Sequence, residues 1–162
     1  ISSILELGSN VGMNLEAINS LAPDAVLDAV EINKTAAAIL GKKNICREIF
    51  NQSIATFSSE NEYDLVFTKT VLIHLNETDL NEAYKCLYEN SSRYILMVEY
   101  YNPSPVTVSY RGHDNKLFKR DFCSDLMKLF PDLKLVKYGF VYRKDPVYQG
   151  GQDDVTWFLL EK

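Results

Sequence analysis

Two glycines and two acidic residues near the start of the chain have the types and spacing that suit binding of a nucleoside. Gly8 and Gly12 lie in a turn after an apolar segment, and Glu31 ends the next one. Glycines permit positive φ and let a ligand approach the backbone closely. A carboxylate at the position of Glu31 can accept hydrogen bonds from both hydroxyls of a ribose, unless it is merely solvated. Glu6 is a charge in an apolar segment, so it needs a partner, either a ligand ammonium or a neighbouring backbone turn.

The same turn departs from the pattern that binds dinucleotides. A GxGxxG pattern aligned on Gly8 needs glycine at positions 10 and 13, where the chain has Asn10 and Met13. The middle glycine lets a pyrophosphate approach the main chain, so its absence argues against NAD. A ligand without phosphates tolerates the Cβ of Asn10, and asparagine readily replaces glycine at positive φ.

His74 is the candidate for a general base, because an imidazole can accept a proton at neutral pH. It follows the fourth apolar segment by about one helical turn, so it either faces the pocket mouth or packs and caps within its own turn. Glu99, Tyr101 and Asn102 follow the fifth apolar segment, and we expect them to point into the same crevice. Tyr101 and Asn102 can shape a pocket for an acceptor, although adjacent tyrosines also occur half in a core and half at its rim.

Arg111 and His113 stand on either side of a glycine in a polar segment. Arg111 can clamp a carboxylate or phosphate of an acidic sugar in bidentate fashion, whereas a solvated loop explains the segment nearly as well.

A small basic cluster follows this segment, with phenylalanines between its members. Basic residues interleaved with aromatic residues occur on RNA-binding surfaces. Charges on a helix surface beside core phenylalanines give the same pattern, and we favour that interpretation. The cluster comprises Lys116, Phe118, Lys119, Arg120 and Phe122.

Strand-like and helix-like segments that alternate along the chain must position these residues. A loop containing Pro103 and Pro105 is expected to lead from the fifth strand to the last helix. The expected strands are Ser3–Leu7, Ala25–Ile32, Ile45–Phe50, Asp64–Thr68, Tyr94–Glu99, Leu133–Tyr142 and Val155–Glu161, and the expected helices are Asn10–Leu21, Lys34–Leu40, Glu77–Asn90 and about Arg120–Phe130.

This alternation predicts an α/β fold, doubly wound, with a mostly parallel seven-stranded sheet and helices on both faces. The last two strands have no helix between them, so they are expected to form a C-terminal antiparallel hairpin at one edge. Ligands of such sheets bind beyond the carboxyl ends of the strands, where the strand order reverses. The glycine turn and Glu31 are expected at that place.

Composition narrows the classes of function. The chain has 162 residues, of which 46% are hydrophobic and 24% charged, as in one globular domain over 1–162. A formal net charge of −5 argues against a nucleic-acid partner. Three cysteines without a CxxC pair and two histidines lead us to expect no metal site.

The apolar runs and the N-terminal end of the sequence bear on where the protein is located. No apolar run approaches the ~18 residues that cross a bilayer, and no signal peptide is visible, so we expect a cytoplasmic protein without a membrane partner. The chain opens with Ile directly into an apolar strand, so we expect a further N-terminal segment in the natural protein. The sequence leaves the oligomeric state open.

Three segments in this order resemble the class I S-adenosylmethionine-dependent methyltransferases, whose fold is Rossmann-like. They are ILELGSNVG (4–12), AVEIN (29–33) and YDLVFTKTVLIHL (63–75). In the C-terminal half, segments 93–106, 110–122, 138–146 and 152–162 look like the methylases associated with pseudaminic acid biosynthesis. This resemblance implies an S-adenosyl-L-methionine cofactor and methyl transfer to a small molecule, a sugar or nucleotide-sugar intermediate of bacterial surface polysaccharide.

The resemblance also implies roles for individual residues. Glu6, Gly8 and Gly12 would surround the methionine part of the donor, and Glu31 would hold its ribose. Residues after the third strand would contact adenine, and those ending the fourth would line the floor beneath the methyl group. The implied cofactor-binding residues are Glu6, Gly8, Ser9, Asn10, Gly12, Glu31, Ile32, Gln52, Ser53, Thr68 and Lys69, and the acceptor-binding residues are Tyr101, Asn102, Arg111 and His113.

Two other functions stay open on the sequence. An NAD-dependent oxidoreductase would use the same fold, although positions 10 and 13 argue against it. A non-catalytic pathway protein would keep the donor pocket without turnover. Methylation of nucleic acid is disfavoured by the acidic charge.

Overall fold

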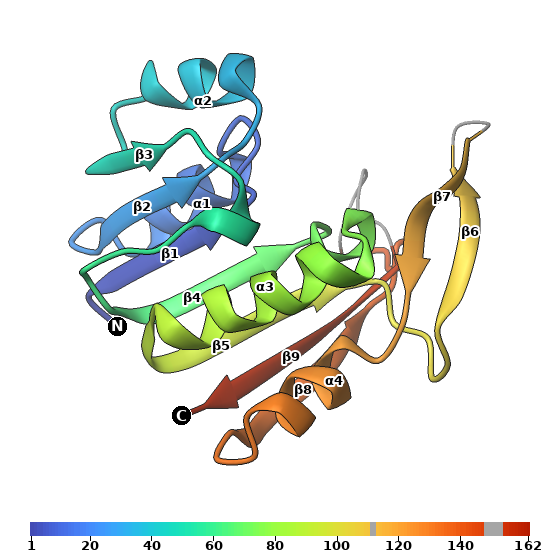
Figure 1. Ribbon diagram of the computed structural model, residues 1–162. Helices are drawn as coiled ribbons and strands as arrows, with labels where there is room; N and C mark the ends of the chain where they lie inside the picture. The colour runs from blue at the N-terminus through green and yellow to red at the C-terminus, as the bar shows by residue number, and fades with distance from the viewer. Residues whose placement is uncertain (111–112, 148–153) are drawn as a thin grey trace.

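The computed structural model describes residues 1–110, 113–147 and 154–162, of which 108–110 and 113–117 are described by their backbone alone. These parts of the chain contain one large sheet, a separate two-stranded sheet and helices (Figure 1). The large sheet comprises β1 (Ser3–Leu7), β2 (Val26–Val30), β3 (Glu48–Phe50), β4 (Tyr63–Lys69), β5 (Ser91–Glu99), β8 (Lys134–Val141) and β9 (Val155–Glu161). The helices are α1 (Met13–Leu21), α2 (Lys34–Gly41), α3 (Glu77–Glu89) and α4 (Phe122–Leu129), with short 3₁₀ turns η1 (Ile54–Thr56) and η2 (Leu72–His74).

The strand order of the large sheet is β3-β2-β1-β4-β5-β9-β8. β1 to β5 are parallel to their neighbours, whereas β9 is antiparallel to both β5 and β8. The predicted doubly wound sheet with an antiparallel C-terminal pair is therefore confirmed. After β3 the chain crosses to the other side of β1 to form β4, so the strand order reverses between β1 and β4.

Alternation along each strand divides the core into two clusters, one on each face of the sheet. Leu5 and Val66 face the cluster that includes residues of α3 and α4. Ile4 and Phe67 face the opposite cluster, which includes Leu15 of α1 together with Leu40 of α2. Because successive side chains of a strand point to opposite faces, each face of the sheet has its own apolar cluster and its own helices, as the sequence predicts.

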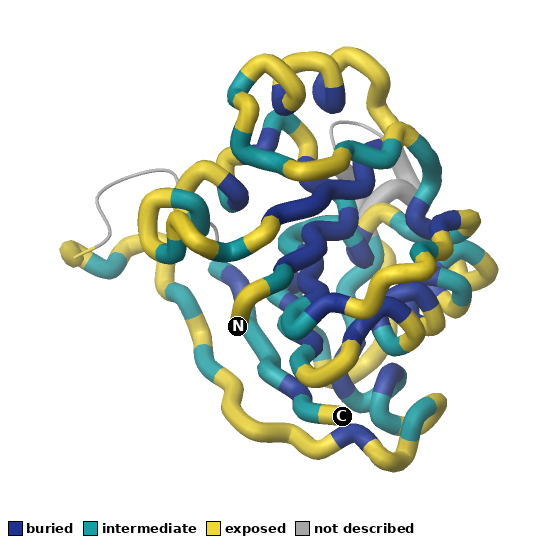
Figure 2. Tube along the Cα trace, turned by 90° about the vertical axis from the view of Figure 1, so that its left-hand side faces the viewer, coloured by how far each residue is buried: buried dark blue, intermediate teal, exposed yellow. Residues whose placement is uncertain are grey.

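The outer edge of the sheet is more exposed than its centre. Figure 2 shows buried residues concentrated in the central strands. β8 is mostly exposed along its length, as expected for an edge strand. Gly139 of β8 lies opposite Trp157 of β9, and a Cβ at Gly139 would lie only 2.6 Å from the indole ring. The single tryptophan of the chain therefore packs closely against a glycine in the last strand pair.

The segment between β5 and α4 differs from the prediction. Residues expected to be a loop form an antiparallel hairpin of β6 (Val106–Tyr110) and β7 (His113–Lys119), which stands apart from the main sheet at the right of Figure 1. The prediction of a loop was wrong because Pro103 and Pro105 only precede the hairpin, while VTVSY is rich in β-branched and aromatic residues.

Several element ends also differ from the prediction. α1 begins at Met13 rather than Asn10, because Asn10 and Gly12 have φ of 49° and 80°, which a right-handed helix excludes. β3 is shorter than expected and β5 begins earlier, at Ser91. Arg120 precedes α4, which begins at Phe122. Asp121 caps the helix by accepting a hydrogen bond from the backbone N–H of Ser124. None of the helices in the described ranges is long and apolar enough to span a bilayer.

Candidate functional site

The turn after β1 is built from residues with positive φ. Gly8, Asn10 and Gly12 have φ of 80°, 49° and 80°. The N–H of Gly8 donates to the carbonyl of Val30 at 2.8 Å, which ties the turn to the end of β2. A Cβ on Gly8 would lie 2.6 Å from a methyl group of Val71, so the turn also packs closely against the segment after β4. The expectation that Asn10 takes a glycine-like conformation is confirmed.

Glu31 is held in a fixed orientation just beyond β2. Its side chain is buried, with 7% exposed. One carboxylate oxygen accepts a hydrogen bond from the N–H of Asn10 and the other from the N–H of Asn33, both at 2.7 Å. Asn33 in turn caps α2 by accepting from the N–H groups of Thr35 and Ala36. Because each carboxylate oxygen can accept more than one hydrogen bond, Glu31 keeps capacity for a ligand.

Glu6 is a fully buried carboxyl with an incomplete set of partners. Its Oε1 accepts from Asn14 of α1 at 2.7 Å, and Lys69 donates to the same asparagine at 3.2 Å. Its Oε2 is buried and has no hydrogen-bond partner among the described atoms. Asp28, a second buried carboxylate of the sheet, is by contrast bound by Arg47, Tyr63 and the N–H of Glu48. Burial raises the pKa of Glu6 to about 8, although Asn14 and Lys69 act to lower it.

Glu99 ties the segment after β4 to the end of β5. Its Oε1 accepts from the N–H groups of Val71 and Leu72 at 3.1 and 3.2 Å, where η2 begins. Burial raises the pKa of Glu99 to about 7, and these two hydrogen bonds oppose the shift. The expectation that Glu99 points into the crevice was wrong, because its carboxyl group turns beneath η2 instead. Glu99 thereby fixes the segment that carries His74.

The raised pKa values of Glu6 and Glu99 predict that the free energy of unfolding falls as pH rises from 5 to 8. Their pKa values in the folded chain exceed the ordinary value of 4.5, so the folded state binds more protons than the unfolded state in this range. The stabilising effect of the protons is complete below about 4.5 and is lost as pH rises through the folded pKa values. Each carboxyl contributes a slope of up to ~1.4 kcal/mol per pH unit.

Thermal unfolding across this range checks the expectation. The Tm of Glu6→Gln and Glu99→Gln variants should vary less with pH than that of the original chain. Glu62→Gln, at an exposed position, is the matched control and should retain the full slope. An unchanged slope in the variant carrying both substitutions would contradict the prediction.

A cavity of about 580 Å³ opens at the carboxyl ends of β1, β2 and β4. Its wall includes the glycine turn, the end of β2, η1 and the segment after β4, so it lies where the strand order reverses. Its volume is in the range of cavities that bind small molecules. Among the predicted site residues, those in its wall are Gly8, Ser9, Asn10, Glu31, Ile32, Ser53, Lys69 and His74.

The other predicted residues lie elsewhere. Glu6 and Thr68 are fully buried, and Gly12 faces the side chain of Leu40, which fills the space that a Cβ on Gly12 would need. Gln52, Tyr101 and Asn102 are not among the described residues of the cavity wall.

The four acceptor-binding candidates lie in the β5–β7 region, and only Tyr101 and Asn102 are described with their side chains. Tyr101 is 42% exposed and packs its ring toward Phe158, with 6.1 Å between ring centroids. Arg111 lies outside the described residues. His113 begins β7 and is described only by its backbone.

Sequence reasoning missed several residues of the wall. Asn14 connects Glu6 to Lys69 by hydrogen bonds. Its place in the first turn of the helix that follows Gly12, as a polar residue, could have indicated a role at the site. Asn33 had a capping signal, an asparagine directly before a helix, that was not connected to Glu31. Val71 had no signal, because its contact with Gly8 depends on how two distant segments meet. Within the described residues, no group of three or more His, Cys, Asp or Glu side chains is placed to hold a metal ion.

Comparisons with known proteins find the fold in solved structures. No family model and no curated protein matches the sequence. The magnesium protoporphyrin IX methyltransferase of Synechocystis PCC 6803, solved with bound SAM, is 13% identical and has a TM-score of 0.68 over 98% of this chain and 69% of its own. A SAM-dependent methyltransferase from Leishmania major is 16% identical, with a TM-score of 0.75 over 98% of this chain and 63% of its own.

A third neighbour gives the same result. The O-methyltransferase of a trans-AT PKS multienzyme from Brevibacillus brevis, in complex with S-adenosyl-L-homocysteine, is 14% identical, with a TM-score of 0.75 over 99% of this chain and 66% of its own. This chain therefore spans about two thirds of the length of these three neighbours. At these identities the likeness is one of fold: the chain has the Rossmann-like fold in which these methyltransferases are built.

Proposed function

We propose that this chain binds S-adenosyl-L-methionine in the 580 Å³ cavity and catalyses transfer of its methyl group to a small-molecule acceptor. The observation that carries the proposal is the orientation of Glu31, whose two carboxylate oxygens are fixed by the N–H groups of Asn10 and Asn33 at the cavity wall. The fold shared with methyltransferases solved with SAM or S-adenosylhomocysteine supports it.

The residues of the cavity fit this donor. Glu31 presents a carboxylate to a pair of ribose hydroxyls. The Oε2 of Glu6, buried without a described partner, supplies negative charge beneath the cavity, where a cationic ligand favours its ionised form. Asn10 places a side chain where a dinucleotide site has its second glycine, which suits a ligand without a pyrophosphate.

The donor supplies an activated methyl group on a sulfonium, so the protein needs chiefly to align donor and acceptor. In the proposal Gly8 and Ser9 hold the methionine part, Ser53 lies on the adenine side, and Lys69 lies below the methyl group. His74, in the wall on η2, accepts a proton when the acceptor must lose one. Glu99 keeps η2, and with it His74, in place.

The proposed acceptor is a sugar or nucleotide-sugar intermediate of bacterial surface polysaccharide, as in pseudaminic acid biosynthesis. Its support is the resemblance of the C-terminal segments, and in particular 93–106 and 110–122. Tyr101, Asn102, Arg111 and His113 are proposed to contact this acceptor.

Calorimetric titration with S-adenosylhomocysteine tests the donor. We expect saturable binding with one site per chain, and no saturable binding of NAD or NADH under the same conditions. Binding of a nicotinamide cofactor in place of S-adenosylhomocysteine would contradict the proposal and favour an oxidoreductase. Transfer of an isotope-labelled methyl group to metabolites of a bacterial extract then separates an enzyme from a protein that only binds the donor.

A further inference from the structure

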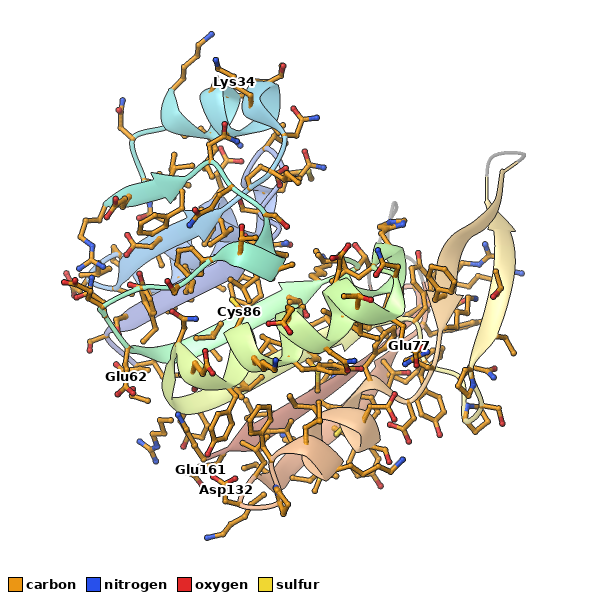
Figure 3. All side chains as sticks on the ribbon, viewed as in Figure 1. Lys34, Glu62, Glu77, Cys86, Asp132 and Glu161 are labelled. Atoms are coloured by element: carbon orange, nitrogen blue, oxygen red, sulfur yellow. The ribbon has the colours of Figure 1, made fainter. Side chains whose placement is uncertain are left out.

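A second, smaller cavity of about 220 Å³ lies between the start of α3 and the β6–β7 hairpin. Figure 3 shows Glu77 at the start of α3, beside the hairpin. Leu75 lines both this cavity and the larger one, so the two cavities adjoin at that residue. The side chains that matter for its chemistry are Leu75, Leu80, Val106, Phe118, Lys119 and Arg120.

Arg120 lines this cavity and has hydrogen-bonding capacity to spare. Its Nε is buried and has no hydrogen-bond partner among the described atoms. Its Nη1 lies 3.5 Å from a carboxylate oxygen of Asp125, longer than the ~2.7–2.9 Å of a strong charge-assisted hydrogen bond. A guanidinium offers five N–H donors in a fixed plane, so this long contact, the one that the described side chains make, leaves most of them for another group.

Lys119 adds a second cation to the same wall. Its Nζ lies 5.1 Å from the centre of the Tyr100 ring, over the ring face. The backbone beside it is held in place, because Arg120 pairs with Tyr101 in a short parallel bridge and its carbonyl accepts from the N–H of Asn102. The two cations are therefore presented from an anchored segment into a cavity with otherwise largely apolar walls.

The acidic groups near Arg120 and Lys119 also have other partners. Asp121 uses its carboxylate to cap α4 through the N–H of Ser124. Asp125 is shared between Arg120 and Lys128, at 3.5 and 3.6 Å. Glu77 also lines the cavity, and because it is exposed to water its charge is partly screened.

We propose that this second cavity binds the carboxylate or phosphate group of the methyl acceptor, held by Arg120 and Lys119. This inference rests on the proposed methyl transfer, because the anion that the cavity would hold is part of the methyl acceptor. The cavity has room for an anionic group and a few attached atoms. Because Leu75 lines both cavities, the rest of that molecule would extend past Leu75 toward the larger cavity. The planar donors of Arg120 match either oxyanion in bidentate fashion.

Amide chemical shifts of the ¹⁵N-labelled chain, followed during titration with simple anions, test the site. We expect saturable shifts at Leu75, Lys119 and Arg120 with potassium phosphate, potassium acetate or both, and none with potassium chloride at equal ionic strength. Tighter binding of phosphate identifies a phosphorylated acceptor, and tighter binding of acetate a carboxylated one. Absence of saturable shifts with both anions overturns the proposal.

Variants separate this site from general surface charge. Arg120→Gln should raise the dissociation constant of the more tightly bound anion at least tenfold. Lys119→Gln, which leaves the Asp125 contact intact, should raise it less. The matched control is Arg93→Gln, which removes an exposed arginine paired with Glu161 on β9 and should leave anion binding unchanged. Equal affinity in the original chain and in both Arg120→Gln and Lys119→Gln overturns the proposal.

A second measurement distinguishes failure of this site from failure of the proposed function. Affinity for S-adenosylhomocysteine should be the same in Arg120→Gln and in the original chain, because Arg120 lies outside the larger cavity. If the anions bind as expected and S-adenosylhomocysteine does not bind the original chain, methyl transfer is overturned, and the anion site is then not one for a methyl acceptor.

Discussion

Replacing Glu31 with glutamine is expected to weaken binding of S-adenosylhomocysteine by at least about a hundredfold. Each charge-assisted hydrogen bond from a ribose hydroxyl contributes roughly 1.5–3 kcal/mol, and ~1.4 kcal/mol corresponds to a factor of ten in the dissociation constant. The glutamine amide also meets the N–H of Asn10 or Asn33 with a donor in place of an acceptor, so its side chain cannot keep the orientation of Glu31. Calorimetric titration measures the loss.

The control for this substitution is Glu48→Gln on the neighbouring strand β3. Glu48 is exposed at the start of β3, and Glu48→Gln removes the same charge at a position outside the cavity wall. The affinity of this variant should therefore match that of the original chain. Thermal unfolding establishes that Glu31→Gln is folded before its affinity is compared. A loss of less than about threefold in a folded Glu31→Gln variant would show that Glu31 does not hold the ribose.

Replacing Gly12 with alanine is expected to destabilise the fold by roughly 2–4 kcal/mol. The residue has φ of 80°, a conformation that a Cβ disfavours, and the new methyl group would collide with the side chain of Leu40. Leu40 is fully buried in the cluster between α1, α2 and the sheet, so it cannot move aside without disturbing that packing. We expect a fall in Tm of roughly 5–10 °C for a chain of this size.

Gly41→Ala is the matched control, because it adds the same methyl group at a glycine that tolerates it. Gly41 is the last residue of α2, and a Cβ there would meet Ile49 at 3.8 Å, an ordinary contact distance. Alanine also favours helix more than glycine does, so the Tm should stay constant or rise slightly. Equal destabilisation by the two substitutions would refute the explanation from backbone conformation and packing.

The sequence predicts the first half of the fold well, because the relevant signals are local there. Gly8, Gly12 and Glu31 each follow or end a strand, and parallel strands bring their carboxyl ends to one edge of the sheet. Their approach to one another therefore follows from the strand order alone. The conformation of Asn10 was predicted for the same reason, since it depends on its own residue type.

The rest depends on contacts between distant segments, which the sequence pattern does not encode. The turn of Glu99 beneath η2 requires β4 and β5 to be neighbours with a particular register. The contact between Gly8 and Val71 has the same origin. The β6–β7 hairpin was missed although its residues favour strands, because two prolines nearby suggested a loop. Arg120 was consequently assigned to a helix surface rather than to a cavity wall.

The close packing of Trp157 against Gly139 gives the protein an intrinsic optical probe at one defined place. Indole emission depends on its surroundings, and this is the sole indole of the chain, so fluorescence reports on separation of β8 from β9. Circular dichroism in the far ultraviolet follows the helices and the whole sheet instead. Comparing the two signals during denaturation reveals whether the last strand pair detaches ahead of the parallel strands that carry the cavity.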